Sequence, residues 1–305
     1  MNGKHVIIAG ANKAGTTSFF EYLAAHPSVC PAFIKQTFFF LNKEWQKKLQ
    51  LTSLYDYDKG IDQYNLFFRN YIEEQLKLEA SPEYLYAPGT AEKIFNFIER
   101  EGGKIVFILR NPVSRFISLF HFGKQQGIID RKCSFYDFLQ RSSVSTGNTN
   151  SSLMAYETGF YSKYLENYVR LFEKDTLRVY FFEDLMTDAK TFMKNVCDDL
   201  QIDKTFYDNF KFTTHNKTIT VKNRFLSDAY KRTREFLIRH TFKSKMGYTT
   251  SMLLKKTITP IYRSVNLTQL QKEEIPDADI QFLQQAYKYE KQKLELMLGV
   301  SVPWQ

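Results

Sequence analysis

The residues best suited to chemistry in this chain follow its first apolar run. Ile7-Ile8-Ala9 leads into a glycine-containing turn and then into polar residues, Gly10-Ala11-Asn12-Lys13-Ala14-Gly15-Thr16-Thr17-Ser18. A strand that turns directly into a helix aims free backbone N–H groups and the positive end of the helix dipole at one point. The ammonium of Lys13 and the hydroxyls of Thr16, Thr17 and Ser18 are expected at the same point. The segment therefore predicts a binding site for a phosphate or a sulfate.

The position of the lysine separates this loop from the common nucleotide-binding loop. Gly10 and Gly15 have the spacing of the G-x-x-x-x-G in a Walker A loop, but Thr16 stands where that loop has its lysine. The lysine lies inside the loop instead, at Lys13. This difference disfavours a kinase or NTPase.

A second motif follows another apolar run, Ile105–Leu109. Arg110 comes directly after this predicted strand, Pro112 suits the first turn of a helix, and Ser118 lies eight residues after Arg110. An arginine binds phosphate through planar, paired hydrogen bonds, and the serine about two turns into the helix can assist it. Ligands of parallel sheets bind beyond the carboxyl ends of the strands, so both loops are expected to open on the same edge.

Taken together, the two motifs resemble the sulfotransferases that use 3′-phosphoadenosine 5′-phosphosulfate (PAPS). Within this family, the chain most resembles the branch that comprises the heparan sulfate sulfotransferases and their bacterial relatives. The resemblance covers nearly the whole chain and extends to Tyr180–Leu185 and to the closing Leu298–Trp304. It implies that the first loop binds the 5′-phosphosulfate, that Arg110 and Ser118 bind the 3′-phosphate, and that Lys222 and Arg224 add phosphate contacts. The residues implied at the 5′ end are Lys13, Ala14, Gly15, Thr16, Thr17 and Ser18.

The position of the catalytic base departs from the family. Glycan-modifying relatives carry Lys-Glu-x-x-Phe-Phe with the glutamate as base, whereas this chain has Lys35-Gln36-Thr37-Phe38-Phe39-Phe40. Gln36 can orient an acceptor by hydrogen bonds but cannot usefully take its proton. The candidates for the base are Glu79, Glu83 and His121, each of which also has an ordinary structural explanation. Lys13 is expected to stabilise the leaving group.

The change at Gln36 also bears on the acceptor. It favours a small molecule with a hydroxyl or nitrogen nucleophile, with a heparan- or capsule-type polysaccharide as the alternative. Two hypotheses from other classes of function stay open: a P-loop kinase-like phosphotransferase and a non-catalytic nucleotide-binding protein.

Composition limits the remaining classes of function. The 305 residues carry a net charge of +9, from 42 basic and 33 acidic side chains, which fits an anionic ligand. The charge is dispersed and no nucleic-acid motif is present, so a nucleic-acid partner is not expected. The three cysteines are scattered, which argues against a metal site and suits a reducing compartment. No stretch approaches the roughly 20 apolar residues of a membrane span, so we expect a cytoplasmic protein; the sequence does not indicate its oligomeric state.

Alternating strands and helices predict an α/β fold with three layers, a central parallel sheet and a P-loop-like phosphosulfate-binding loop. A single domain is expected over residues 1–305, since no linker or repeat interrupts the pattern. We also expect a surface loop over Ser142–Ser152 and one helix over Asp277–Leu298. The predicted strands are His5–Ala9, Lys77–Ser81, Lys104–Leu109 and Leu177–Phe182.

Overall fold

The computed structural model describes residues 5–49, 53–68, 70–73, 75–144, 154–213 and 273–304, with the short pieces 219–221, 226, 229–230, 232–233, 264–265 and 267–269. Its contacts divide the chain into two units. The larger comprises Met1–Leu119, Ser134–Asn216 and Ile275–Gln305, and the smaller comprises Phe120–Cys133 and Lys217–Glu274. The single domain expected over residues 1–305 stays a prediction.

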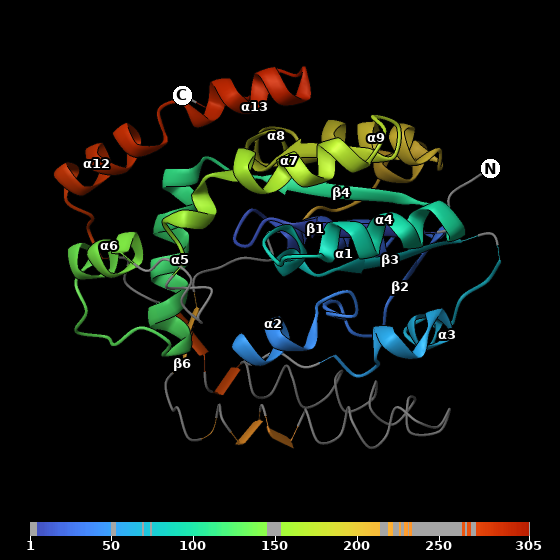
Figure 1. The fold of residues 1–305 in the computed structure, drawn as a ribbon, viewed down its shortest axis with the longest axis horizontal. Helices are drawn as coiled ribbons and strands as arrows, with labels where there is room; N and C mark the ends of the chain where they lie inside the picture. Colours follow the sequence, from blue (N-terminus) through green and yellow to red (C-terminus); the bar gives the residue numbers. More distant parts are fainter. Residues whose placement is uncertain are drawn as a thin grey trace. The chain divides into compact units, whose positions relative to one another are not determined.

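A five-stranded parallel sheet runs through the larger unit (Figure 1), in the order β2-β3-β1-β4-β5. Each of its four pairings is parallel, and β1 and β4 are neighbours near the centre. This arrangement confirms the central parallel sheet predicted from the sequence. The strands are β1 (His5–Gly10), β2 (Val29–Pro31), β3 (Leu76–Ala80), β4 (Lys104–Leu109) and β5 (Leu177–Phe181).

The central strands are apolar on both faces because helices cover both faces of the sheet. Ile7 and Phe107 belong to one core cluster, whereas Ile8 and Val106 belong to the other. Continuous runs of β-branched and aromatic residues are typical of such buried parallel strands. Helices α4 (Thr90–Glu101), α7 (Tyr161–Leu171) and α13 (Glu290–Leu298) supply the first cluster, and α1 (Thr16–Ala24), α8 (Phe182–Thr187) and α9 (Ala189–Leu200) supply the second. The three predicted layers are therefore confirmed.

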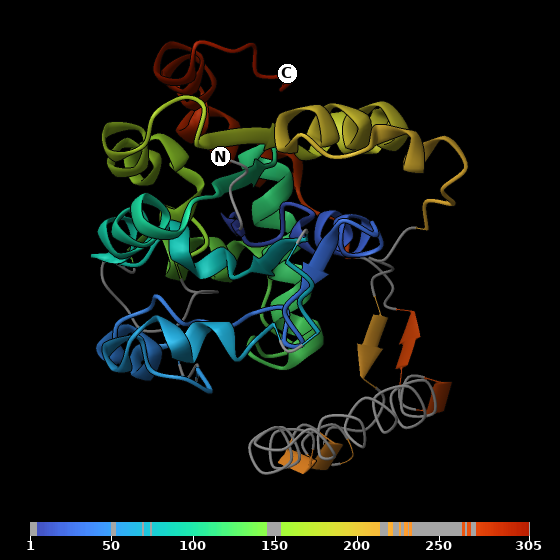
Figure 2. The ribbon, with the colours of Figure 1, turned by 90° about the vertical axis from the view of Figure 1, so that its right-hand side faces the viewer.

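The remaining elements are shorter or lie at the margins of the sheet. In the smaller unit β6 (Ile219–Val221) and β7 (Leu267–Gln269) pair antiparallel, and Figure 2 shows them as two arrows side by side. Helix α5 (Pro112–Gln126) follows β4 and runs from the larger unit into the smaller. The other helices are α2 (Lys43–Lys48), α3 (Ile61–Asn65), α6 (Phe135–Val144) and α12 (Asp277–Tyr287), and 3₁₀ turns cover Tyr57–Lys59, Pro82–Leu85, Glu157–Gly159 and Lys204–Asp208.

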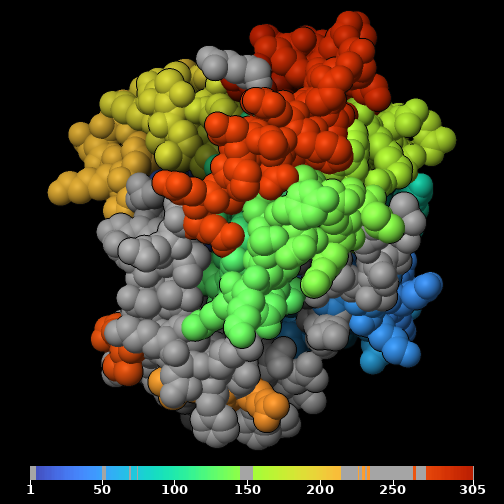
Figure 3. Space-filling model, turned by 90° about the vertical axis from the view of Figure 1, so that its left-hand side faces the viewer, coloured from blue at the N-terminus to red at the C-terminus, as the bar shows by residue number. Residues whose placement is uncertain are grey.

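The prediction of one helix over Asp277–Leu298 is wrong, because the chain forms α12 and α13 with a break between them. The two helices pack on different partners. Helix α12 lies along α6, as the red and green surfaces in Figure 3 show, and its Tyr287 contacts Phe160. Glu290, the first residue of α13, is buried and accepts hydrogen bonds from the backbone N–H and the hydroxyl of Ser162 at the start of α7. A straight helix could not satisfy both sets of contacts.

Two further differences lie at segments with weak sequence signals. The loop expected over Ser142–Ser152 begins too early, because Ser142–Val144 form the last residues of α6; residues 145–153 lie outside the described part. The sequence also gave no indication of β2. This strand has only three residues at the edge of the sheet, too few to show a periodic pattern.

Candidate functional site

The loop after β1 has the backbone of an anion-binding turn. Lys13 and Gly15 both have positive φ, +63° and +89°, and α1 begins immediately afterwards at Thr16. The N-cap residue is Gly15, so no side chain caps the first turn of α1. The N–H groups at a helix start are then available to a negatively charged ligand.

Phe182 supports this loop from the first turn of α8. A Cβ atom at Gly15 would lie 2.4 Å from Cδ2 of Phe182, so only glycine fits between the loop and the ring. The same ring carries the guanidinium of Arg110, whose Cζ lies 4.7 Å from the ring centre. One aromatic side chain thus contacts both predicted phosphate-binding loops. Sequence reasoning did not single out Phe182, since an isolated phenylalanine carries no such signal.

Three cationic side chains gather at the first loop. Arg110 donates a hydrogen bond of 3.4 Å to the carbonyl oxygen of Lys13, and Lys35 donates one of 2.8 Å to the hydroxyl of Thr17. Burial, reinforced by the charge of Arg110, lowers the pKa of Lys13 to about 8. Burial also lowers the pKa of Lys35 to about 8, where the charge of Glu21 opposes and that of Lys13 adds to the effect. A dianionic group bound at this point would favour the charged forms of all three side chains.

Two hydrogen bonds fix the turn that carries Arg110. The hydroxyl of Tyr161 donates to the carbonyl oxygen of Arg110 at 2.8 Å, and the N–H of Asn111 donates to Oε1 of Glu183 at 2.9 Å. The other carboxylate oxygen of Glu183 accepts from the indole N–H of Trp304 at 3.0 Å. Glu183, to which the sequence assigned no role, therefore positions the second loop.

The other residues predicted to bind phosphate have fewer defined contacts with the two loops. Ser118 is half-buried on α5, two turns beyond Arg110, and no hydrogen bond joins the two within the described ranges. Thr16 and Ser18 are buried in the first turn of α1 with Ala14 and Gly15 just before them. Lys222 and Arg224 lie outside the described residues.

The candidates for the base occupy very different surroundings. Gln36 is exposed, whereas Glu79 is fully buried and both of its oxygens accept hydrogen bonds from hydroxyl groups. The donors are Thr37 at 2.7 Å and Ser81 at 2.9 Å to Oε2, and Tyr64 at 3.3 Å and Tyr84 at 3.1 Å to Oε1. Burial raises the pKa of Glu79 to about 7, although the hydrogen bonds from Thr37, Ser81 and Tyr84 oppose the shift. His121 is buried in the smaller unit, beside Phe120.

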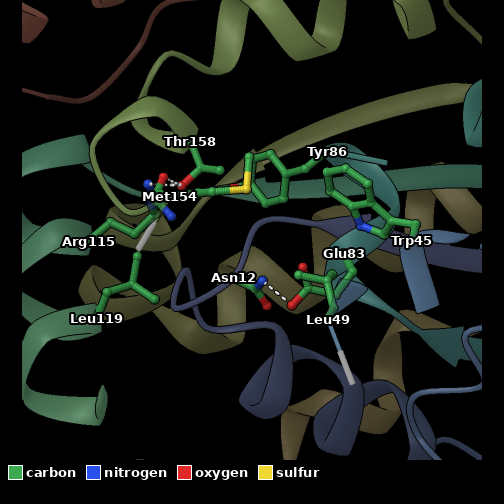
Figure 4. A pocket seen from close by; sticks show the side chains of 9 residues that line it. All are labelled: Asn12, Trp45, Leu49, Glu83, Tyr86, Arg115, Leu119, Met154 and Thr158. Atoms are coloured by element: carbon green, nitrogen blue, oxygen red, sulfur yellow. Dashed lines mark hydrogen bonds between the residues drawn. The ribbon is translucent and has the colours of Figure 1, made fainter. Parts of the chain in front are cut away.

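Glu83 lies instead in a pocket beside the first loop (Figure 4). Its Oε1 accepts a hydrogen bond of 2.6 Å from the side-chain amide of Asn12, the residue before Lys13. Burial raises the pKa of Glu83, against the opposing effects of Asn12 and of the positive charge of Arg115. About 280 Å³ of space, its open mouth included, is lined by Asn12, Trp45, Leu49, Glu83, Tyr86, Arg115, Leu119, Met154 and Thr158.

Two properties of the described residues bear on metal binding and on membranes. Among those residues, no group of three or more His, Cys, Asp or Glu side chains could hold a metal ion. No described helix has the length and apolar character needed to cross a bilayer.

Comparison with known proteins places these features in one family. A family model of the sulfotransferase domain matches residues 3–293. The chain is similar to human heparan sulfate glucosamine 3-O-sulfotransferase 5, with 27% identity over 183 residues that cover 60% of this chain and 49% of that protein. It is also similar to the membrane-associated sulfotransferase kil1 of Dictyostelium discoideum, with 32% identity over 122 residues, 39% of this chain and 23% of that protein. The chain spans about half the length, or less, of these curated relatives.

The fold is similar to that of a sulfotransferase from Alicyclobacillus acidocaldarius. The TM-score is 0.57 at 21% sequence identity, over 78% of this chain and 94% of that chain. At this identity the similarity concerns the arrangement of the elements.

The surroundings of Glu79 predict a pH-dependent stability. The folded protein holds the proton of Glu79 up to about pH 7, whereas the unfolded chain releases it near pH 4.5. The free energy of unfolding should therefore fall by about 3 kcal/mol as the pH rises through this window. In Glu79→Gln, which has no ionisation there, urea unfolding between pH 4.5 and 7.5 should show a flatter pH dependence.

A different result would identify Glu79 as the base. If Glu79→Gln leaves the pH dependence of unfolding unchanged but abolishes the pH dependence of turnover, the side chain acts in catalysis. Glu79→Ala serves as a control, since it leaves four hydroxyls without their acceptor and should lower stability at every pH.

Proposed function

Because the chain belongs to the sulfotransferase domain family, whose members take their sulfuryl group from PAPS, we propose that it transfers this group to the hydroxyl of a small-molecule acceptor. The observation that carries the proposal is the gathering of Lys13, Lys35 and Arg110 around the start of α1. Their charges and the helix N-terminus suit a ligand with closely spaced anionic groups.

PAPS would lie across the carboxyl ends of β1 and β4. Lys13, Lys35 and the residues from Ala14 to Ser18 would hold the 5′-phosphosulfate at the end of β1. Arg110 and Ser118 would hold the 3′-phosphate at the end of β4, with Lys222 and Arg224 as further predicted contacts. The hydrogen bonds from Tyr161 and to Glu183 support this assignment, since they fix the turn of Arg110 before any ligand arrives.

In the proposed reaction the acceptor oxygen attacks sulfur in line with the bond that breaks. The new S–O bond forms as the bond between sulfur and the bridging phosphate oxygen breaks, and 3′-phosphoadenosine 5′-phosphate (PAP) leaves. Negative charge builds on that phosphate oxygen, where the Lys13 ammonium and the N-terminus of α1 would stabilise it.

Glu83 is the residue that we propose as the base. It lies in the pocket beside the first loop, and its raised pKa suits a group that takes a proton near neutral pH. The hydrogen bond from Asn12 connects its carboxylate to the residue before Lys13. Glu79 has each oxygen occupied by two hydroxyls and does not line this pocket, which supports a positioning role for it. Exposed Gln36 then orients the acceptor at most.

The change at Gln36 supports a small acceptor, because the glycan-modifying relatives carry their glutamate base at that position. A second candidate is a glycan acceptor, favoured by the similarity to heparan sulfate 3-O-sulfotransferases over 60% of the chain. Labelled PAPS offered to small phenols and alcohols and to heparan-type polysaccharides would separate the two. A cytoplasmic location and the absence of a nucleic-acid partner stay predictions from the sequence.

Nucleotide binding gives the first prediction for this function. PAP at 100 times its dissociation constant adds about 2.7 kcal/mol to the free energy of unfolding, which corresponds to a rise of about 5 °C in melting temperature. ATP with magnesium should give no comparable shift. A larger shift with ATP would favour the kinase-like alternative instead.

Removal of the Lys13 ammonium tests its role at the leaving group. Lys13→Ala should lower kcat by about 10²- to 10³-fold, as expected for a lost stabiliser of developing charge. In the wild type, affinity for PAP should decline above about pH 8 as Lys13 and Lys35 lose their protons. Lys211→Ala, which removes an exposed lysine, is the control. Full turnover by Lys13→Ala would contradict the assignment.

Glu83→Gln tests the base. It should lower kcat by about 10²- to 10⁴-fold and remove the rise of kcat with pH that ionisation of Glu83 produces, with the affinity for PAP unchanged. Rates measured from pH 5 to pH 9 provide the comparison. A variant that keeps the wild-type pH profile would show that the proton goes elsewhere.

A further inference from the structure

The pocket beside Asn12 contains buried polar atoms whose hydrogen bonds are missing. The indole N–H of Trp45, the hydroxyl of Tyr86 and the Nε–H of Arg115 are each shielded from solvent and have no hydrogen-bond partner among the described residues. All three side chains line the pocket, with Arg115 on one side in Figure 4 and Trp45 and Tyr86 on the other. An unsatisfied buried donor costs free energy, so three around one space indicate a missing acceptor.

Arg115 strengthens this indication because its charge is also buried. The side chain is 1% exposed, and its Nη2 donates to the carbonyl oxygen of Ala155 and to the hydroxyl of Thr158. These partners are neutral, and none of the ion pairs found in the described ranges includes Arg115. A buried guanidinium is normally compensated by an anion.

Glu83 does not supply that compensation by direct contact, although it lies in the same pocket. Its Oε1 is held by Asn12 on the side of the first loop, and its carboxylate influences Arg115 only through the electrostatic field. The pocket therefore has a carboxylate near the loop and a cation with two further polar groups around the rest of its wall.

We propose that the acceptor bears a carboxylate, bound by Arg115, Trp45 and Tyr86, in addition to the hydroxyl that receives the sulfuryl group. This inference rests on the proposed function and specifies its substrate class. The carboxylate oxygens accept from the Nε–H of Arg115, the indole N–H of Trp45 and the hydroxyl of Tyr86. The hydroxyl at the other end of the molecule then faces Glu83 and the first loop. The aromatic rings of Trp45 and Tyr86 suit a planar body between the two groups.

Three small ligands of similar shape separate the effect of a carboxylate charge on binding from the effect of shape. With PAP saturating, 3-hydroxybenzoate, 3-hydroxybenzamide and 3-methylphenol would be titrated into the protein by calorimetry. The carboxylate should bind about tenfold or more tightly than the methyl compound, as expected for a charge-assisted hydrogen bond, with the neutral amide between them. Equal affinities of acid and amide, or of acid and methyl compound, would overturn the proposal.

Two conservative variants test the same contacts without disturbing the buried guanidinium. Trp45→Phe and Tyr86→Phe keep the rings and remove the unpartnered groups. Each should weaken 3-hydroxybenzoate binding about threefold to tenfold and leave 3-methylphenol binding unchanged. Because these groups have no partner in the part of the chain that the structure describes, the melting temperature of each variant should stay the same or rise. A fall in melting temperature with unchanged probe affinity would show a purely structural role.

A matched control and a donor assay complete the design. Thr90→Val removes a buried, unpartnered hydroxyl that does not line the pocket, and should change none of the probe affinities. The thermal shift with PAP is recorded in parallel for every variant. If PAP fails to stabilise the wild type, the proposed function fails; if PAP binds and the probes do not differ, only the carboxylate is refuted.

Discussion

The ring of Phe182 is the contact on which both predicted phosphate-binding loops depend. It occupies the space that a side chain on Gly15 would need, and its other contact is the guanidinium of Arg110. The parallel pairing of β1 with β4 brings the two loops to one edge of the sheet, and the ring then sets how closely they approach. If either loop moved away from the other, it would lose its packing against this side chain.

The site gathers like charges, and the surrounding fold holds them in place. Lys13 and Lys35 lie half-buried at the first loop with their pKa values lowered, so the unliganded protein keeps them there at a cost in free energy. The core on both faces of the sheet offsets that cost. Binding of an anion would recover it, and this is how a preorganised site favours its ligand over water. The pocket beside Asn12 shows a similar cost, because it buries polar groups that have no hydrogen-bond partner among the described residues.

The sequence was sufficient for the parts of the fold in which local pattern and packing agree. The apolar runs of β1 and β4 are buried on both faces, so they stand out without any knowledge of the partner strands. The break between α12 and α13 could not be predicted, because it follows from the contacts of Tyr287 and Glu290 with distant residues. The pocket beside Asn12 could not be predicted either, since Trp45, Tyr86 and Met154 come from separate segments. Glu79 and Glu83 are alike in the sequence and differ only in their surroundings, so the sequence alone could not separate a carboxylate held by four hydroxyls from one that lines a pocket.

The hydrogen bond between Trp304 and Glu183 has a consequence for synthesis of the protein. The turn that carries Arg110 is braced by Glu183, and Glu183 is in turn held by a residue made much later. A ribosome that has released the sheet and both loops has still not supplied the indole that completes this brace. Because α13 and Trp304 also belong to the first core cluster, the nascent chain can complete neither that core nor the brace of the Arg110 turn until residue 304 has emerged.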